Sequence, residues 1–306
     1  MNLFKKAWLL LFIVASLFFV YDYLQRQVGG LQQSFKFYPV FFFLAALVYL
    51  LFWLNVIWCW RQIVSIIANV KLSFSAGFRQ IALMTLGKYL PGKVWGMAAR
   101  AALIKQQGIG FKEALLATFH EQYLFLHAAV VLSCLLLAVL FEAAWSLAVG
   151  LLGLLSIPFA LLSQNYIFIL FNYSSRKLGY RDVLDKTNIL SAKNYLKILA
   201  AYFLVWILSG IAFAGVYLAF FNSHFSLELL FALILANTVG NTLGFLALFA
   251  PGGIGVREGV ASSILAGFMP LGDAVILSLL FRLWVVVFDA LSSLVLLWPS
   301  DTTYKA

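Results

Sequence analysis

The stretch APGGIGVREG, which covers Ala250–Gly259, interrupts a long apolar region with a proline, three closely spaced glycines and two adjacent charges. Hydrocarbon offers no water to free backbone groups, so such a break persists at membrane depth only where protein buries it or where it lines a wet cavity. A charge at that depth is costly and marks a candidate functional site. The residues that form the break and its charges are Pro251, Gly252, Gly253, Gly255, Arg257 and Glu258.

A similar stretch, GKYLPGK, lies in the first half of the chain. Pro91 and Gly92 again interrupt an apolar region, and Lys88 and Lys93 flank them. Two apolar segments broken by glycine and proline, at corresponding places in two halves, are the best sequence indication of a transporter's binding site. The prolines and glycines of both breaks are therefore predicted structural or hinge positions, and the two halves could form an inverted repeat.

Composition places the chain in a membrane. Of its 306 residues, 64% are hydrophobic and 10% are charged, whereas a soluble domain is about half apolar and about a quarter charged. We expect a single all-α polytopic domain over residues 1–306. The net charge is +10. Lysines and arginines that hold loops in the cytoplasm and contact anionic lipid explain this charge better than nucleic-acid binding does. Cys59 and Cys134 show no metal or disulfide spacing, and we expect no metal or cofactor.

Apolar runs of about 20 residues or more predict membrane-spanning helices. We expect about six full spans and two broken, re-entrant hairpins, about eight hydrophobic elements in all. The first hairpin is expected to combine 81–90 with 94–104, and the second to combine 229–249 with 256–268. A segment over 173–197 is expected to be cytoplasmic and to hold an amphipathic helix. The predicted full spans are 7–21, 39–67, 114–140, 144–171 (kinked at Pro158), 196–221 and 273–298.

The charge distribution predicts the orientation. Residues 61–112 carry eight basic residues and no acidic one, so this region should begin and end in the cytoplasm. Counting spans then places both termini in the cytoplasm and lets the two hairpins enter from opposite faces. Two alternatives stay open: the first pair of short helices could lie on the membrane surface, and 229–249 could span fully, which would put the second break at the cytoplasmic face.

Each break precedes a helix start, where free N–H groups and partial positive charge suit an anion. Lys88, Lys93 and Arg257 add full charges, so the sequence predicts a pocket for a phosphate or another anionic head group. The alternative is that the lysines are interfacial anchors and that Arg257 pairs only with its neighbour Glu258.

Other charges could belong to the same site. Arg282 and Asp289 lie two turns apart on one predicted helix face, and could pair with each other or with Glu258. Arg100 could line the cavity or face the cytoplasm. Asn237, Asn241 and the small residues Gly240 and Gly244 share a face, which favours close helix packing with hydrogen bonds between helices.

His120 and Glu121 could suggest metal or acid–base chemistry. No second histidine follows at i+4, and no third ligand has a metal spacing. A satisfied polar cluster or a cytoplasmic vestibule explains them better. Among functional roles, Glu121 as a proton-relay carboxylate is more plausible than a metal site, and Glu258 and Asp289 are further candidates for a relay or an ion pair.

The stretches YLPGKVWGMAARAALIKQQG (Tyr89–Gly108) and APGGIGVREG resemble the two signatures of the lysylphosphatidylglycerol synthase transmembrane-region family, also called flippase-like domain proteins. LLFRL (Leu279–Leu283) extends the resemblance, which covers nearly the whole chain. Trp95-Gly96-Met97 departs from the Gly-Glu step of many relatives, so a mechanism that needs a carboxylate there is not expected. The resemblance implies that the family's functional positions correspond here to Lys93, Arg100, Pro251, Gly252, Gly253, Gly255, Arg257, Glu258 and Arg282.

The resemblance implies an inner-membrane domain that moves or presents lipids. In two-part members this domain flips aminoacylated phosphatidylglycerol made by a soluble synthase domain. No such domain follows here before Ala306, so we expect no aminoacyl transfer and a transporter rather than an enzyme. Stand-alone members resemble accessory proteins of cell-envelope or polysaccharide assembly that handle phospholipid or polyprenyl-phosphate carriers.

The leading hypothesis is a bacterial inner-membrane translocase for a lipid with an anionic head group. Lys93 and Arg257 would bind the phosphate, and Glu258 and Arg282 would hold the second break in place. Energy could come from the lipid gradient or from protons through Glu121 or Glu258. The alternatives are a non-transporting membrane partner of a glycosyltransferase, and an intramembrane transferase that uses His120 and Glu121.

Overall fold

The computed structural model describes residues 37–89, 95–105, 107–177, 190–221, 225–247 and 250–297, and within these ranges the chain forms helices joined by short turns, without a strand. The all-α prediction is thus confirmed. The predicted span 7–21 and the tip residues Pro91, Gly92 and Lys93 lie outside the described residues.

Six described helices are long and apolar enough to cross a membrane. Five of them match predicted full spans, and α8 is the first limb of the second predicted hairpin. These helices are α2 (Pro39–Ile67), α5 (Phe111–Leu140), α6 (Ala144–Lys177), α7 (Ala192–Phe220), α8 (Leu227–Leu246) and α10 (Leu271–Ser293), which η3 (Leu294–Leu297) follows.

Local sequence signals set where several helices begin. Pro39 occupies the first turn of α2, where its missing N–H is not needed. Ser73, Ser191 and Ser226 cap the helices that follow them, because each side chain accepts a backbone N–H of the first turn. These caps start α3 at Phe74 and α7 at Ala192, earlier than the apolar pattern alone predicted.

The connection before α7 differs from its prediction. Helix α6 continues through Pro158 and ends at Lys177, so it includes the start of the predicted cytoplasmic segment 173–197. The end of that segment belongs to α7, and 178–189 lie outside the described residues. The described parts of this segment are therefore extensions of two long helices rather than a separate amphipathic helix.

Two broken hairpins complete the fold. The first consists of α3 (Phe74–Gly87) and α4 (Trp95–Lys105), and the second of α8, the short 3-10 turn η2 (Pro251–Gly253) and α9 (Val256–Leu265). Helices α3 and α4 pack on each other, as do α8 and α9. Both predicted Pro-Gly breaks thus separate two packed helices.

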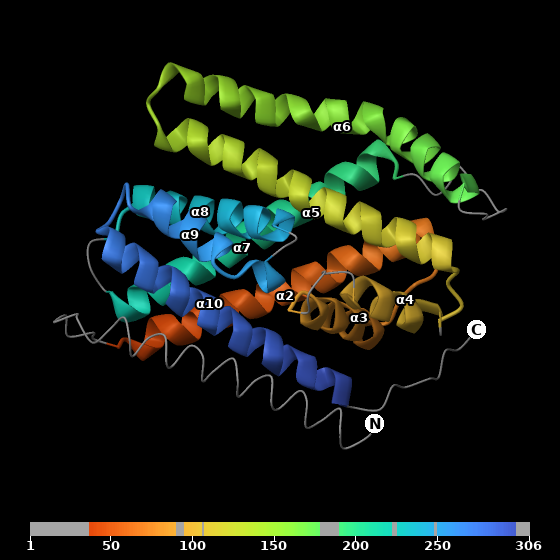
Figure 1. Cartoon of the computed structure of the whole chain (residues 1–306), viewed down its shortest axis with the longest axis horizontal. Coiled ribbons are helices and arrows are strands. Elements are labelled where there is room, and N and C mark those ends of the chain that lie inside the picture. The colour runs from red at the N-terminus through yellow and green to blue at the C-terminus, as the bar shows by residue number, and fades with distance from the viewer. Residues whose placement is uncertain are drawn as a thin grey trace.

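The hairpins enter the bundle from opposite ends. Helices α2 and α7 are antiparallel neighbours, because the N–H of Tyr38 before α2 donates to the carbonyl of Ala219 at the end of α7 (2.9 Å). Since α3 follows α2 and α8 follows α7, the two hairpins start at opposite ends, and Figure 1 shows α3–α4 toward one end and α8–α9 toward the other. Their tips meet inside the bundle, where the N–H of Gly252 donates to the carbonyl of Lys88 (2.9 Å).

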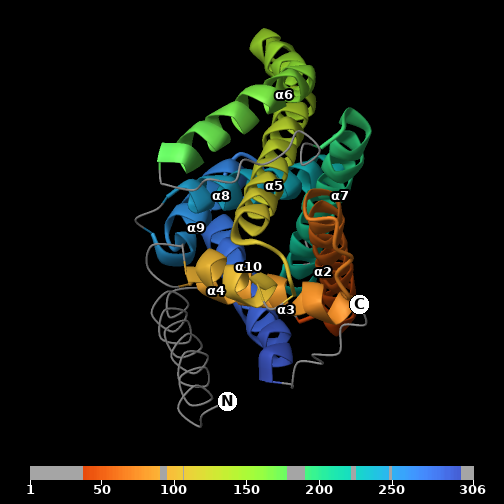
Figure 2. The same cartoon turned by 90° about the vertical axis from the view of Figure 1, so that its right-hand side faces the viewer.

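Each half has the same order of elements: a long helix, a broken pair and a second long helix. Helices α2 to α5 form the first set and α7 to α10 the second, while α6 lies at the edge beside α5 (Figure 2). The contacts correspond as well, because α5 packs on α8 and α10 packs on α3. The last long helix of each half thus packs on the broken pair of the other half, as expected for the predicted inverted repeat.

Candidate functional site

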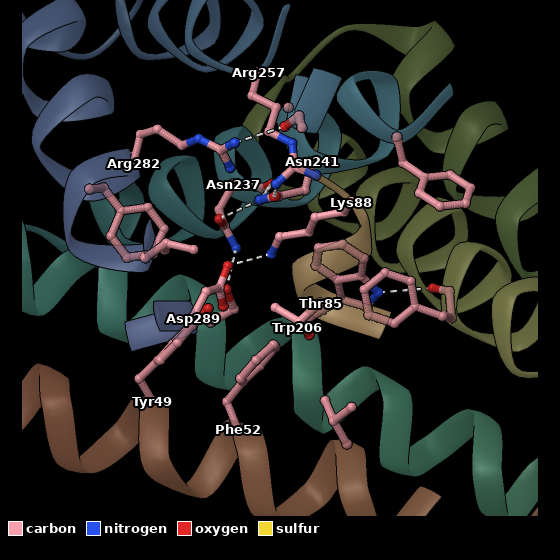
Figure 3. Close-up of a pocket in the computed structure, with 18 of the residues that line it drawn as sticks. Tyr49, Phe52, Thr85, Lys88, Trp206, Asn237, Asn241, Arg257, Arg282 and Asp289 are labelled. Atoms are coloured by element: carbon pink, nitrogen blue, oxygen red, sulfur yellow. Dashed lines mark hydrogen bonds and ion pairs between the residues drawn. The ribbon is translucent and has the colours of Figure 1, made fainter. Parts of the chain in front are cut away.

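A cavity of about 230 Å³ lies where the two hairpin tips meet. Side chains from both tips and from α2, α5, α7, α8 and α10 line it. Figure 3 shows Lys88, Arg257 and Arg282 converging on one side of this cavity, with the rings of Tyr49 and Phe52 on the other. The cavity thus has one basic wall and one aromatic wall, and the rings of Trp206, Phe213 and Phe281 also line it.

Glycines bring Arg257 to the cavity. A Cβ at Gly244 of α8 would overlap the Arg257 side chain, and one at Gly240 would lie 2.9 Å from the Arg257 carbonyl oxygen. The break adds Gly253, which has φ +72° and would place a Cβ 2.7 Å from Arg257 Nε. Close approach of α9 to α8 therefore depends on the absence of these side chains.

The Arg257 guanidinium has only neutral partners among the described residues. Its Nη1 donates to Asn241 Oδ1 (2.6 Å), and its buried Nε has no hydrogen-bond partner. The amide of Asn241 donates to Asn237 Oδ1 (2.8 Å), and that of Asn237 to Ser209 Oγ on α7 (2.9 Å). The simple Arg257–Glu258 pair that the sequence left open is not formed.

Glu258 and Arg282 hold the second tip together. Glu258 Oε2 accepts the backbone N–H of Gly255 (2.7 Å), and its Oε1 lies 3.5 Å from Arg282 Nε. Arg282 Nη2 also donates to the carbonyl of Gly252 (2.9 Å). Because Glu258 already occupies an N–H at the start of α9, the predicted free helix N-terminus is partly filled by the chain itself.

Lys88 and Asp289 join the first tip to α10. The Lys88 ammonium lies 2.5 Å from Asp289 Oδ2, and the Tyr89 hydroxyl donates to the same oxygen (2.6 Å). The Tyr89 ring lies under the Arg282 guanidinium, 5.4 Å from its carbon to the ring centre. Arg282 and Asp289 therefore do not pair with each other: the carboxylate partner of Arg282 is Glu258 of the second tip, and the cation partner of Asp289 is Lys88 of the first tip.

Arg100 lies behind the cavity wall. It is fully buried, contacts Glu121 Oε2 (2.6 Å) and stacks 3.9 Å above the Trp60 ring. Glu121 and its neighbour Gln122 line the edge of the cavity, but Arg100 does not. His120 forms a 3.0 Å bond with the carbonyl of Leu116, as expected of a satisfied polar cluster.

The structure brings together half of the site residues that the sequence singled out. Those that line the cavity are Lys88, Glu121, Gly252, Arg257, Glu258, Arg282 and Asp289. Reasoning from the sequence had placed Asn241 at a helix contact only, and it missed Tyr49, Phe52 and Tyr89. Tyr89 precedes Pro91 by two positions, so proximity to the break was a usable signal, whereas Tyr49 and Phe52 sit in an apolar span that hides them.

The fold defines a polytopic helical membrane protein in which two broken hairpins meet at a charged cavity. More particularly, the chain belongs to the family described as the lysylphosphatidylglycerol synthase transmembrane region, whose model matches residues 7–293. This match confirms the resemblance and makes the chain a membrane protein of the flippase-like type. Among curated proteins, no sequence matches it significantly.

Proposed function

We propose that the protein is a lipid translocase of the bacterial inner membrane, which binds an anionic phosphate head group in the cavity between the hairpin tips. The observation that carries the proposal is Arg257, a cation that lines the cavity and has no carboxylate partner among the described residues. Burial of an unpaired charge costs several kcal/mol, and an anionic ligand would offset that cost.

The rest of the cavity suits a lipid. Arg282 Nη1 is a second buried guanidinium nitrogen without a hydrogen-bond partner, and guanidinium groups match the geometry of phosphate oxygens. The aromatic wall offers an apolar surface to the glycerol or first chain carbons. Because the two tips enter from opposite ends, relative movement of the hairpins would open the cavity to either side in turn.

In this proposal the protein acts as a single transporter domain rather than as an enzyme, and its partners are an anionic phospholipid or a polyprenyl phosphate used in envelope or polysaccharide assembly. Both termini would be cytoplasmic.

The test is flipping of labelled lipids in liposomes. Wild type, Arg257→Ala, Arg257→Lys and Lys193→Gln would be compared with labelled phosphatidylglycerol and with a short polyprenyl phosphate. Lys193 is exposed at the start of α7, so its variant controls for the loss of one positive charge. We expect Arg257→Ala to reduce flipping at least about tenfold, Arg257→Lys to retain part of it and the control to match wild type.

Folding would be verified by thermal unfolding. Wild-type flipping in folded Arg257→Ala would contradict the assignment of Arg257. If folded wild type moves neither lipid, the translocase proposal is wrong, and a non-transporting partner of a glycosyltransferase becomes the leading function.

A further inference from the structure

The charges around the cavity almost cancel. The charged side chains that line it, among the described residues, are Lys88, Glu121, Arg257, Glu258, Arg282 and Asp289. Arg100 lies directly behind Glu121, at 2.6 Å. Four cations thus face three carboxylates, and the group carries one net positive charge.

Three ion pairs account for all but one of these charges: Lys88 with Asp289, Arg282 with Glu258, and Arg100 with Glu121. Arg257 is the remaining cation, and its partner is the neutral Asn241. A ligand with one negative charge would complete the balance, whereas a ligand with two would leave an unbalanced negative charge in a buried site. Such an imbalance is disfavoured because interactions between charges are strong where water is excluded.

Lipid phosphates differ in the negative charge that they carry. A phosphodiester head group carries one negative charge, whereas a phosphomonoester carries about −1.5 to −2 near pH 7, because its second pKa is about 6. Both present oxygens that a guanidinium can bind. The net charge of the site, rather than its hydrogen-bond donors, would therefore distinguish them.

Of the three carboxylates, Asp289 is the one that neither caps a helix nor neutralises a fully buried arginine. Glu258 caps the start of α9, and Glu121 neutralises the fully buried Arg100. The carboxylate of Asp289 instead contacts Lys88 and Tyr89, two residues of the first tip. Its removal would release the Lys88 ammonium toward a ligand and would uncap no helix.

We infer that Asp289 is a specificity-determining residue, which sets the net charge of the described residues around the cavity at +1 and so selects lipids with a phosphodiester head group over phosphomonoester lipids. The inference rests on the proposed function, because it assumes that the cavity binds the phosphate of a lipid.

The test compares two soluble ligands with the same body, dihexanoyl phosphatidylglycerol (a diester) and dihexanoyl phosphatidic acid (a monoester). Affinities would be measured by calorimetry on purified full-length protein in uncharged detergent at pH 7.5 and low salt. Wild type should bind the diester more tightly. Asp289→Asn should shift the affinity ratio toward the monoester by at least about tenfold. Asp273→Asn, on the same helix but outside the cavity, should leave the ratio unchanged.

A second pair of variants tests whether charge, rather than residue identity, carries the effect. Lys88→Met lowers the net charge to zero and should weaken both ligands, the monoester more. Lys88→Met combined with Asp289→Asn returns the charge to +1 and should restore the wild-type ratio. This double variant also removes the one ion pair as a unit, so no buried partner is left unbalanced.

An affinity ratio that stays at the wild-type value in folded Asp289→Asn would overturn the inference while leaving the proposed function intact. So would a double variant that keeps the ratio of Asp289→Asn. If wild type binds neither ligand at any attainable concentration, the proposed function itself is wrong. The two failures are therefore distinct.

Discussion

At the scale of single residues, the two charges at the start of α9 bind partners on different helices: Arg257 on α8 and Glu258 on α10. Arg257 and Glu258 are adjacent, yet Arg257 bonds Asn241 and Glu258 faces Arg282. Neighbouring positions on a helix point in different directions, whereas positions three or four apart face each other. The sequence could identify these residues as membrane-buried charges, but their partners come from other helices and were not predictable from local periodicity.

Replacement of Arg257 by methionine should separate function from stability. Arg257→Met removes an unpaired buried cation and keeps much of the side-chain volume, so the thermal midpoint of unfolding in detergent should equal or exceed that of wild type. Cavity water can take over the bond to Asn241. Binding of dihexanoyl phosphatidylglycerol should fall at least about tenfold. A clearly lower midpoint would instead mean that Arg257 stabilises the fold.

At the scale of the elements, helix existence was easier to predict than helix ends. The apolar patterns located all the described long helices, because lipid-facing and core-facing residues are both apolar. The starts of α3 and α7 depend on Ser73 and Ser191, which lie outside the apolar runs. The close contact of α8 with α9 was partly predictable, since Gly240 and Gly244 are spaced by one helical turn.

The second hairpin offers a matched pair of glycine substitutions. Gly244→Ala places a methyl group against the Arg257 side chain, and it should destabilise the protein by about 1–3 kcal/mol and weaken lipid binding. Gly259→Ala, in α9 with open space at its Cβ, should be neutral or stabilising by up to about 1 kcal/mol. Thermal and denaturant unfolding would measure both.

The cause of the Gly244 effect can be isolated with a double variant. In an Arg257→Ala background the overlapping side chain is gone, so Gly244→Ala should cost much less stability there. Equal costs in both backgrounds would show that the clash with Arg257 is not the reason.

At the scale of the whole molecule, the paired Pro-Gly breaks predicted two corresponding halves, and the structure has them. What the sequence could not provide is how the halves meet. Tyr89 and Asp289 are 200 residues apart, and no periodic pattern links them. The aromatic wall was also hidden, because an apolar residue that lines a cavity looks the same in sequence as one that faces lipid.

The opposite entry of the hairpins predicts opposite exposure of their outer ends. Ser75→Cys at the start of α3 and Ala266→Cys at the end of α9 are both exposed positions, and each would be made in a Cys59→Ala/Cys134→Ala background. A membrane-impermeant thiol reagent added to intact cells should label Ala266→Cys only, because the basic region around α3 should be cytoplasmic. Permeabilised cells should show labelling of both. Equal labelling of the two in intact cells would contradict this arrangement.

The hydrogen bond between the tips also has a consequence for biosynthesis. Gly252 follows Lys88 by about 160 residues, which a ribosome that adds roughly 5–20 residues per second takes roughly ten to thirty seconds to make. During that interval the first tip has been made, but Gly252, whose N–H donates to it, has not. Until then the backbone carbonyl of Lys88 needs another hydrogen-bond partner, such as water, so the nascent first tip should stay beside the insertion machinery or at the membrane surface.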